Sequence, residues 1–107
     1  MQLMTKELEK RFAKVGSQEN IENPIVIAKF FNPTGRGTWL ATEYNPSDKI
    51  FFGYVSLFGD HCDEWGSFGL AELQDYKDKR FGLGIERDLH FKEQPIKPLI
   101  KHYTKRR

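Results

Sequence analysis

The stretch from residue 38 to residue 58 constrains the fold of this chain more than any other. Two runs rich in β-branched and aromatic residues, 38–44 and 50–58, flank a polar segment that has Pro46 in its second place. This pattern is typical of a β-hairpin whose loop is built on a type I turn. The second run is apolar at both alternating sets of positions, so we expect a central strand that is covered on both faces.

Regular alternation assigns the residues of the first run to two faces of the sheet. One face would carry Trp39, Ala41 and Glu43, and the other would carry Leu40, Thr42 and Tyr44. Gly53 interrupts the second run, and a glycine inside a strand indicates a bulge or the close approach of another element.

Hydrophobic spacing predicts two helices, one on each side of this hairpin. Residues 4–15 form an amphipathic pattern, for which Thr5 is a suitable N-cap and Gly16 a natural C-terminal stop. A second helix is expected over residues 70–79. Its buried stripe would consist of Leu70, Leu73 and Tyr76.

Two further segments have the composition of strands. Residues 24–31 predict a first strand that opens with Pro24, and residues 89–91 predict a short last strand. The chain is therefore expected to be α+β. Its elements would be an N-terminal helix, a three-stranded antiparallel meander, a second helix packed on the sheet, a short final strand and a basic C-terminal tail.

Length and composition indicate one domain that stays in the cytoplasm. The 107 residues suffice for a single core, and the aromatic content of 14% supplies much of the area that such a core buries. No apolar run approaches the roughly 20 residues of a membrane span, and the first residues lack a signal-peptide core. Cys62 is the only cysteine, which excludes an internal disulfide and any paired-cysteine metal motif.

The charge of the chain is unevenly distributed. Residues 92–107 hold six Lys and Arg against one Glu, a net charge of +5, which leaves −3 for residues 1–91 within the total of +2. We expect a domain over residues 1–94 and a basic tail over residues 95–107. Such tails bind polyanions in some proteins and are solvated ends in others. The candidate nucleic-acid contacts are Arg36, Trp39, Lys97, Lys101, Lys105, Arg106 and Arg107.

The segment 59–66 has the densest chemistry in the chain. It offers carboxylates, the imidazole of His61 and the thiol of Cys62, which are ligand types that suit zinc. Consecutive residues lack the spacing of known metal motifs, so we predict no bound metal. An acidic connecting loop that Trp65 holds to the core is the simpler interpretation. The candidate partner-binding residues of this loop are Asp60, Asp63, Glu64 and Trp65.

No catalytic constellation can be assembled from the sequence. A nucleophile and its base would require Cys62 or a serine beside one of three histidines, His61, His90 and His102. Cys62 adjoins His61, but neighbours on an extended chain point apart, and the nearby acids would raise the pKa of the thiol. We predict that the protein is not an enzyme and holds no cofactor. A metal-dependent hydrolase is the weakest of the alternatives.

Three blocks of sequence together resemble a known family. They are residues 4–8 with Phe12, the run Phe31-Asn32-Pro33-Thr34-Gly35 with residues 38–39 and 41–44, and residues 81–91. Over residues 3–92, the chain resembles a family of short single-domain bacterial proteins of unknown function, often carried on plasmids and integrative conjugative elements. The resemblance implies a cytoplasmic accessory protein of a mobile genetic element. It assigns no catalytic residue and does not extend to the basic tail.

Two functions of different classes follow from these patterns. In the first, the protein binds and masks a partner protein, which in a mobile-element setting could be a host-defence nuclease whose nucleic-acid channel the acidic loop imitates. In the alternative, the basic tail binds nucleic acid with Arg36 or Trp39 as further contacts. An open patch formed by Trp39, Tyr44 and Trp65 would favour a protein interface.

Overall fold

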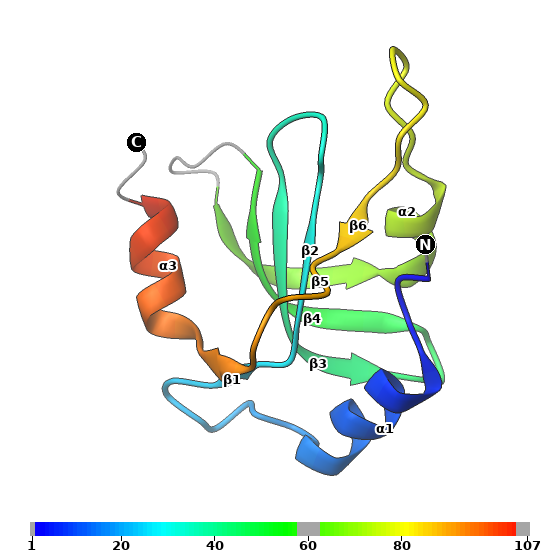
Figure 1. Cartoon of the computed structure of the whole chain (residues 1–107). Helices are drawn as coiled ribbons and strands as arrows, with labels where there is room; N and C mark the ends of the chain where they lie inside the picture. The colour runs from blue at the N-terminus through cyan, green and yellow to red at the C-terminus, as the bar shows by residue number, and fades with distance from the viewer. Residues whose placement is uncertain (1, 58–62, 105–107) are drawn as a thin grey trace.

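The computed structural model describes residues 2–57 and 63–104 and has an α+β architecture (Figure 1). Five antiparallel strands form one sheet in the order β5-β4-β3-β2-β6, and β1 pairs with β7 beside it. The strands are β1 (Ile25–Val26), β2 (Ala28–Phe31), β3 (Thr38–Asn45), β4 (Ile50–Ser56), β5 (Glu64–Gly69), β6 (Glu86–Arg87) and β7 (Gln94–Pro95). The helices are α1 (Lys6–Val15), α2 (Leu70–Asp75) and α3 (Ile96–Thr104).

The predicted α+β class is confirmed, but a three-stranded meander underestimates the sheet. β5 continues the sheet beyond β4, and β6 adds a strand beside β2 at the opposite edge. The composition of segment 59–66 predicts a connecting loop, yet Glu64 already belongs to β5. Gly66 and Gly69 weaken the strand signal there, because glycine is depleted in strands. The predicted last strand over residues 89–91 is wrong, since the pairing with β2 involves residues 86–87 instead.

Helix α1 has the caps that its sequence predicts. The Thr5 hydroxyl accepts a hydrogen bond from the N–H of Leu8 at 3.1 Å. At the other end, Gly16 takes a positive φ of 70°, and its N–H donates to the Phe12 carbonyl. The positive φ is strained for residues with a Cβ, so glycine suits this stop. Phe12 is buried and fixes the helix to the sheet.

Helix α2 is shorter than its sequence predicts. It ends at Asp75, and Tyr76 is in an extended conformation with 41% of its surface exposed. Tyr76 therefore does not belong to the buried stripe, whereas Leu70 and Leu73 are buried as predicted. The Tyr76 hydroxyl instead accepts a hydrogen bond from the side-chain amide of Asn32 at 3.3 Å, which links the end of α2 to the turn after β2.

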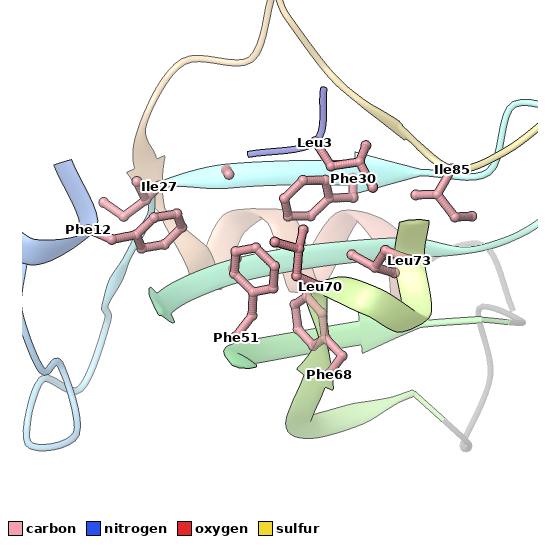
Figure 2. Close-up of a cluster of buried hydrophobic side chains, with 11 residues drawn as sticks. Leu3, Phe12, Ile27, Phe30, Phe51, Phe68, Leu70, Leu73 and Ile85 are labelled. Atoms are coloured by element: carbon pink, nitrogen blue, oxygen red, sulfur yellow. The ribbon is translucent and has the colours of Figure 1, made fainter. Parts of the chain in front are cut away.

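The main hydrophobic core lies on one face of the sheet, which α1 and α2 cover; we call it the α1–α2 face. Figure 2 shows Phe30, Phe51 and Phe68, from three different strands, beside Leu70 and Leu73 of α2. The ring centroids of Phe30 and Phe51 are 5.1 Å apart, and those of Phe51 and Phe68 are 5.3 Å apart. Burying one such ring contributes on the order of 1.5–3 kcal/mol, so these aromatic residues supply much of the stability of a small domain.

A smaller core lies on the opposite face, which we call the α3 face. Helix α3 and helices α1 and α2 are on opposite sides of the sheet (Figure 1). The buried residues of this core are Val26, Leu40, Tyr54 and Ile96, and Phe91, Leu99 and Ile100 pack against them. Residues 96–104, which the charge pattern assigns to a basic tail, thus form a helix that is packed on the sheet.

Helix α3 begins earlier than its prolines predict. A proline disfavours helical conformation in the residue before it, but α3 starts at Ile96 with Pro98 in its first turn. Proline is tolerated there because the first N–H groups of a helix have no partner within the helix. The neighbouring N–H groups are satisfied by the segment before β1. Ile96 donates to the Pro24 carbonyl at 2.9 Å, and Lys97 donates to the Asn23 side chain at 3.0 Å.

A β-bulge interrupts the pairing of β3 with β4. Ala41 pairs with Gly53 and Glu43 pairs with Phe52, so Thr42 is the extra residue with no counterpart in the register of β4, although its hydroxyl donates to the Phe52 carbonyl at 3.2 Å. An extra residue of this kind shifts the alternation of the strand that contains it. The bulge predicted from Gly53 is confirmed, although the extra residue belongs to the neighbouring strand.

The bulge changes which residues of β3 share a face. In β4, Phe52 and Tyr54 belong to one alternating set of positions, and Tyr54 packs on the α3 face. Leu40 pairs with Tyr54 and Glu43 pairs with Phe52, so Leu40 and Glu43 are both directed to that face. Ala41 and Tyr44 pair with the other set and face α1 and α2. The regular alternation predicted from the sequence is therefore wrong beyond Ala41.

Gly53 permits an unusually close approach of two strands. A Cβ atom at this position would lie 1.8 Å from the carbonyl oxygen of Leu40 and 2.8 Å from its carbonyl carbon. These are backbone atoms, so no side-chain rotation can relieve the overlap. β3 and β4 can have this geometry only with glycine at position 53.

We expect Gly53→Ala to lower the free energy of unfolding by about 3 kcal/mol or more, because the strands must separate at the bulge to admit a methyl group. Gly66→Ala in β5 is the matched control, since a Cβ there meets nothing within 4 Å. It should change stability by less than about 0.5 kcal/mol. Urea unfolding followed by circular dichroism measures both variants. Equal stability of the two would contradict the assigned role of Gly53.

Candidate functional site

A groove of about 560 Å³ lies open on the α3 face. The sheet contributes residues of β3, β4 and β5, and the polar segment between α1 and β1 forms the other side. The lining residues are Gln18, Glu19, Ile21, Glu22, Pro24, Thr42, Glu43, Phe52 and Trp65. We call this the aromatic groove. Helix α3 packs over Leu40 and Tyr54, and the aromatic groove occupies sheet surface that α3 leaves uncovered.

Two stacked aromatic rings dominate the sheet side of the aromatic groove. The centroids of Phe52 and Trp65 are 6.0 Å apart with 18° between the ring planes, and the two residues are 39% and 42% exposed. The Trp65 ring also meets the ring of Tyr54 edge-on at 5.9 Å. The sequence predicts that Trp65 is anchored in the core and that β4 is covered on both faces. Both predictions fail here, because Phe52 and Trp65 lie on an open part of the α3 face.

Acidic residues form the polar part of the aromatic groove. Glu19, Glu22 and Glu43 line it, and no Lys or Arg is among the described residues that do so. Glu22 accepts a hydrogen bond from the ammonium group of Lys97 at 2.8 Å. That hydrogen bond, and then the charge of Lys97, hold the pKa of Glu22 below its usual range. Glu22 is therefore ionised at neutral pH.

The predicted acidic loop is only partly within the described structure. Asp60 lies outside the described residues, as do His61 and Cys62. Asp63 accepts a hydrogen bond from the Ser56 hydroxyl at 2.8 Å, and Ser56 belongs to the same alternating set of β4 as Phe52. Glu64 is exposed and pairs with Val55, so alternation directs it away from the α3 face. Asp63 and Trp65 therefore share a side of the sheet that Glu64 does not.

Most of the segment 59–66 that carries zinc-type ligands lies outside the described residues. Within residues 2–57 and 63–104, no three His, Cys, Asp or Glu side chains come close enough together to hold a metal ion. Of the remaining histidines, His90 and His102 are both exposed. His90 follows Asp88, whose carboxylate accepts a hydrogen bond from the N–H of His90 at 2.9 Å, which closes a local turn.

Trp39, Tyr44 and Trp65 do not form one open patch. Trp39 and Tyr44 are partly buried against the main core on the α1–α2 face. Trp65 lies on the other side of the sheet. At the aromatic groove, the exposed apolar residues are instead Phe52 and Trp65, together with Ile21 on the opposite wall, which is 54% exposed.

The candidate nucleic-acid contacts are not gathered on one surface. Lys97 and Lys101 belong to α3, where Lys97 forms an ion pair with Glu22. Trp39 packs on the opposite side of the sheet, and Arg36 is exposed in the turn between β2 and β3. The remaining candidates, Lys105, Arg106 and Arg107, lie outside the described residues.

Gln18 lines the aromatic groove, and no pattern in the sequence predicts this role. It is 7% exposed and makes three hydrogen bonds to main-chain atoms. Its amide donates to the Ile25 carbonyl at 2.9 Å and to the Thr42 carbonyl at 2.8 Å, and its oxygen accepts from the Ile25 N–H at 2.8 Å. Gln18 therefore ties the segment before β1 to the bulge in β3, and this connection joins the two walls of the aromatic groove.

A family model described as "Protein of unknown function (DUF2958)" matches residues 3–105. The match continues through β7 and α3, whereas the resemblance found in the sequence ends at residue 92. No curated protein and no solved structure matches the chain. None of the helices in the described part of the chain has the length and apolar character needed to cross a membrane.

We expect Gln18→Leu to destabilise the fold by about 2–3 kcal/mol, because a side chain of similar size would remove three hydrogen bonds to main-chain groups, one of them buried and two part-buried. Gln74→Leu on the exposed side of α2 is the matched control and should have little effect. Thermal unfolding measures the difference. A stable Gln18→Leu variant with an unchanged transition would show that the segment before β1 does not depend on this amide.

Proposed function

We propose that the chain, which belongs to the DUF2958 family of proteins of unknown function, acts by binding another protein at the aromatic groove and performs no chemistry of its own. The observation that carries this proposal is the stacked pair of Phe52 and Trp65. Both rings lie on a sheet surface without a covering element among the described residues, although α3 covers the same face nearby.

Large exposed aromatic side chains favour a protein interface over a solvated surface. Full burial of such a side chain contributes roughly 1.5–3 kcal/mol, and rings that stay about two-fifths exposed forgo part of that free energy. Trp and other aromatic residues are also enriched among the residues that contribute most to binding. In this chain Trp65 is not required to fill the core, since the main core lies on the other face of the sheet.

The charges around the aromatic groove suggest which surface a partner presents. Glu19, Glu22 and Glu43 line it, and Asp63 lies on the same side of the sheet. A basic surface, such as the nucleic-acid channel of a nuclease, is complementary to this arrangement. Together with the mobile-element context that the family resemblance implies, this charge pattern supports our proposal of a cytoplasmic accessory protein of a mobile genetic element that masks a host-defence nuclease. Glu64 would contribute to its negative field from the other side of the sheet, and Asp60, which lies outside the described residues, would add a further negative charge.

Site-specific photocrosslinking tests the position of the interface. With a benzophenone amino acid in place of Phe52 or Trp65, we expect one discrete adduct with another protein when cells of the source organism are irradiated. The control replaces Phe81, which is 63% exposed on the loop after α2. That position should not give the same adduct. Adducts from position 81 alone, or none from positions 52 and 65, would contradict the proposed interface.

The adduct also tests the proposed kind of partner. If the crosslinked protein is a nuclease, the purified chain should inhibit its cleavage of DNA or RNA in proportion to concentration. Trp65→Ser should weaken this inhibition at least tenfold, because the variant loses the most exposed ring of the pair. A partner without nuclease activity would exclude the masking of a nuclease and leave the protein interface in place.

The alternative of nucleic-acid binding rests on the net charge of +5 over residues 92–107. Lys97 is already paired with Glu22, and Trp39 and α3 are on opposite faces of the sheet, so we expect no tight complex. A mobility-shift titration with single- and double-stranded DNA and RNA at about 50 and 200 mM salt measures this directly. Micromolar binding that collapses at the higher salt would favour the alternative.

A further inference from the structure

We propose that the aromatic groove receives an arginine side chain from an extended basic segment of the partner. This inference rests on the proposed function and deepens it by naming the chemistry of the occupant. Three properties of the aromatic groove lead to it: the exposed ring surface, two carboxylates that form no ion pair within the described residues, and the open shape.

The ring surface favours a cation that can lie flat. A guanidinium group stacks on aromatic rings and gains a cation–π attraction, which is strongest with Trp. Phe52 and Trp65 are close to parallel and about two-fifths exposed, so each leaves part of its apolar ring surface open, and we call these exposed ring surfaces the aromatic platform. Arg80 and Phe81 form this kind of contact within the chain itself, with the guanidinium carbon 5.2 Å from the ring centroid.

The carboxylates supply the complementary charge. Lys97 compensates Glu22, but within the described residues Glu19 and Glu43 form no ion pair. Glu43 is directed toward the α3 face because of the bulge, and it pairs across the sheet with Phe52. A carboxylate thus lies next to the aromatic platform on the neighbouring strand. A planar guanidinium can bind such a carboxylate with two hydrogen bonds while its face rests on a ring.

The shape of the aromatic groove suits a side chain of an extended segment. Its volume of about 560 Å³ lies in the range of sites that hold small ligands, and it is open to the surface. A single residue can therefore enter while the chain that carries it continues outside. The aliphatic part of an arginine would contact Ile21, the exposed apolar residue of the opposite wall.

A nuclear magnetic resonance titration tests this inference with a defined probe. The probe is a capped hexapeptide of alternating glycine and arginine, and the matched peptide carries glutamine instead of arginine. The indole N–H resonance of Trp65 reports on the aromatic groove. That of Trp39, on the other face of the sheet, is an internal control.

We expect the arginine peptide to shift the Trp65 resonance in a saturable manner and to leave the Trp39 resonance in place. The lysine analogue should bind more weakly, and the glutamine peptide should give no saturable shift. Equal shifts from the arginine and glutamine peptides would overturn the inference. Shifts of similar size at Trp39 and Trp65 would also overturn it, since they would indicate nonspecific binding of the peptide to both faces of the sheet.

Charge-neutral variants locate the carboxylates that bind the peptide. Glu19→Gln combined with Glu43→Gln should raise the dissociation constant of the arginine peptide at least fivefold. The control, Glu7→Gln with Glu9→Gln, removes the same charge from exposed positions of α1 and should change it by less than twofold. If both double variants raised the dissociation constant equally, the peptide would be responding to the net charge of the protein alone. That result would contradict a specific arginine site in the aromatic groove.

The two proposals can fail separately. Crosslinking from positions 52 and 65, together with no preference for arginine, would overturn the arginine site and support the protein interface. Saturable binding of the arginine peptide without any crosslinked partner would support the cation site and contradict the proposed function.

Discussion

The close approach of β4 to the carbonyl group of Leu40 at Gly53 is the constraint on which the rest of the structure depends. It accompanies the bulge at Thr42, and the bulge reverses the alternation of β3. Tyr44 is thereby directed into the main core beside Phe12 and Phe51, where the ring centroids lie 5.8 and 4.7 Å from that of Tyr44. On the other face, the same shift places a carboxylate beside an aromatic ring. One local irregularity therefore completes the core and creates the polar edge of the candidate site.

The candidate site is assembled from segments that stabilise one another. The Thr42 carbonyl, released from the ladder by the bulge, accepts a hydrogen bond from Gln18, and Gln18 also fixes the main chain at Ile25. The adjoining Asn23 and Pro24 accept hydrogen bonds from the first turn of α3. A single polar network thus connects the bulge, the wall of the aromatic groove and the C-terminal helix. The position of the aromatic groove is therefore fixed by hydrogen bonds between segments that are distant in sequence.

Local signals made part of this structure predictable. Thr5 and Gly16 mark the ends of α1 because capping depends on residues adjacent in sequence. The hairpin of β3 and β4 and the special role of Gly53 follow in the same way. Interactions between distant segments were not predictable: Pro98 lies inside α3 because Asn23 and Pro24 satisfy the first turn, and Trp65 is exposed because α3 covers only part of its face. Of the described residues predicted to bind a partner, Trp65 lines the aromatic groove, whereas Asp63 and Glu64 are not among its lining residues. Gln18, Glu43 and Phe52 line it without a signal in the sequence.

The pairing of β1 with β7 has a consequence for synthesis of the chain on the ribosome. Residues 25–26 cannot pair as a strand until residues 94–95 have emerged from the ribosome. Leu40 and Tyr54 likewise cannot pack against Ile96 until Ile96 has emerged. The α1–α2 face can form from residues 3–85, while the α3 face stays open to water until the last helix has left the exit tunnel. Contacts across such a span close slowly, and an uncovered apolar sheet face is prone to association during that interval. Translation pauses within residues 86–104 would prolong that exposure, whereas rapid completion of this segment would shorten it.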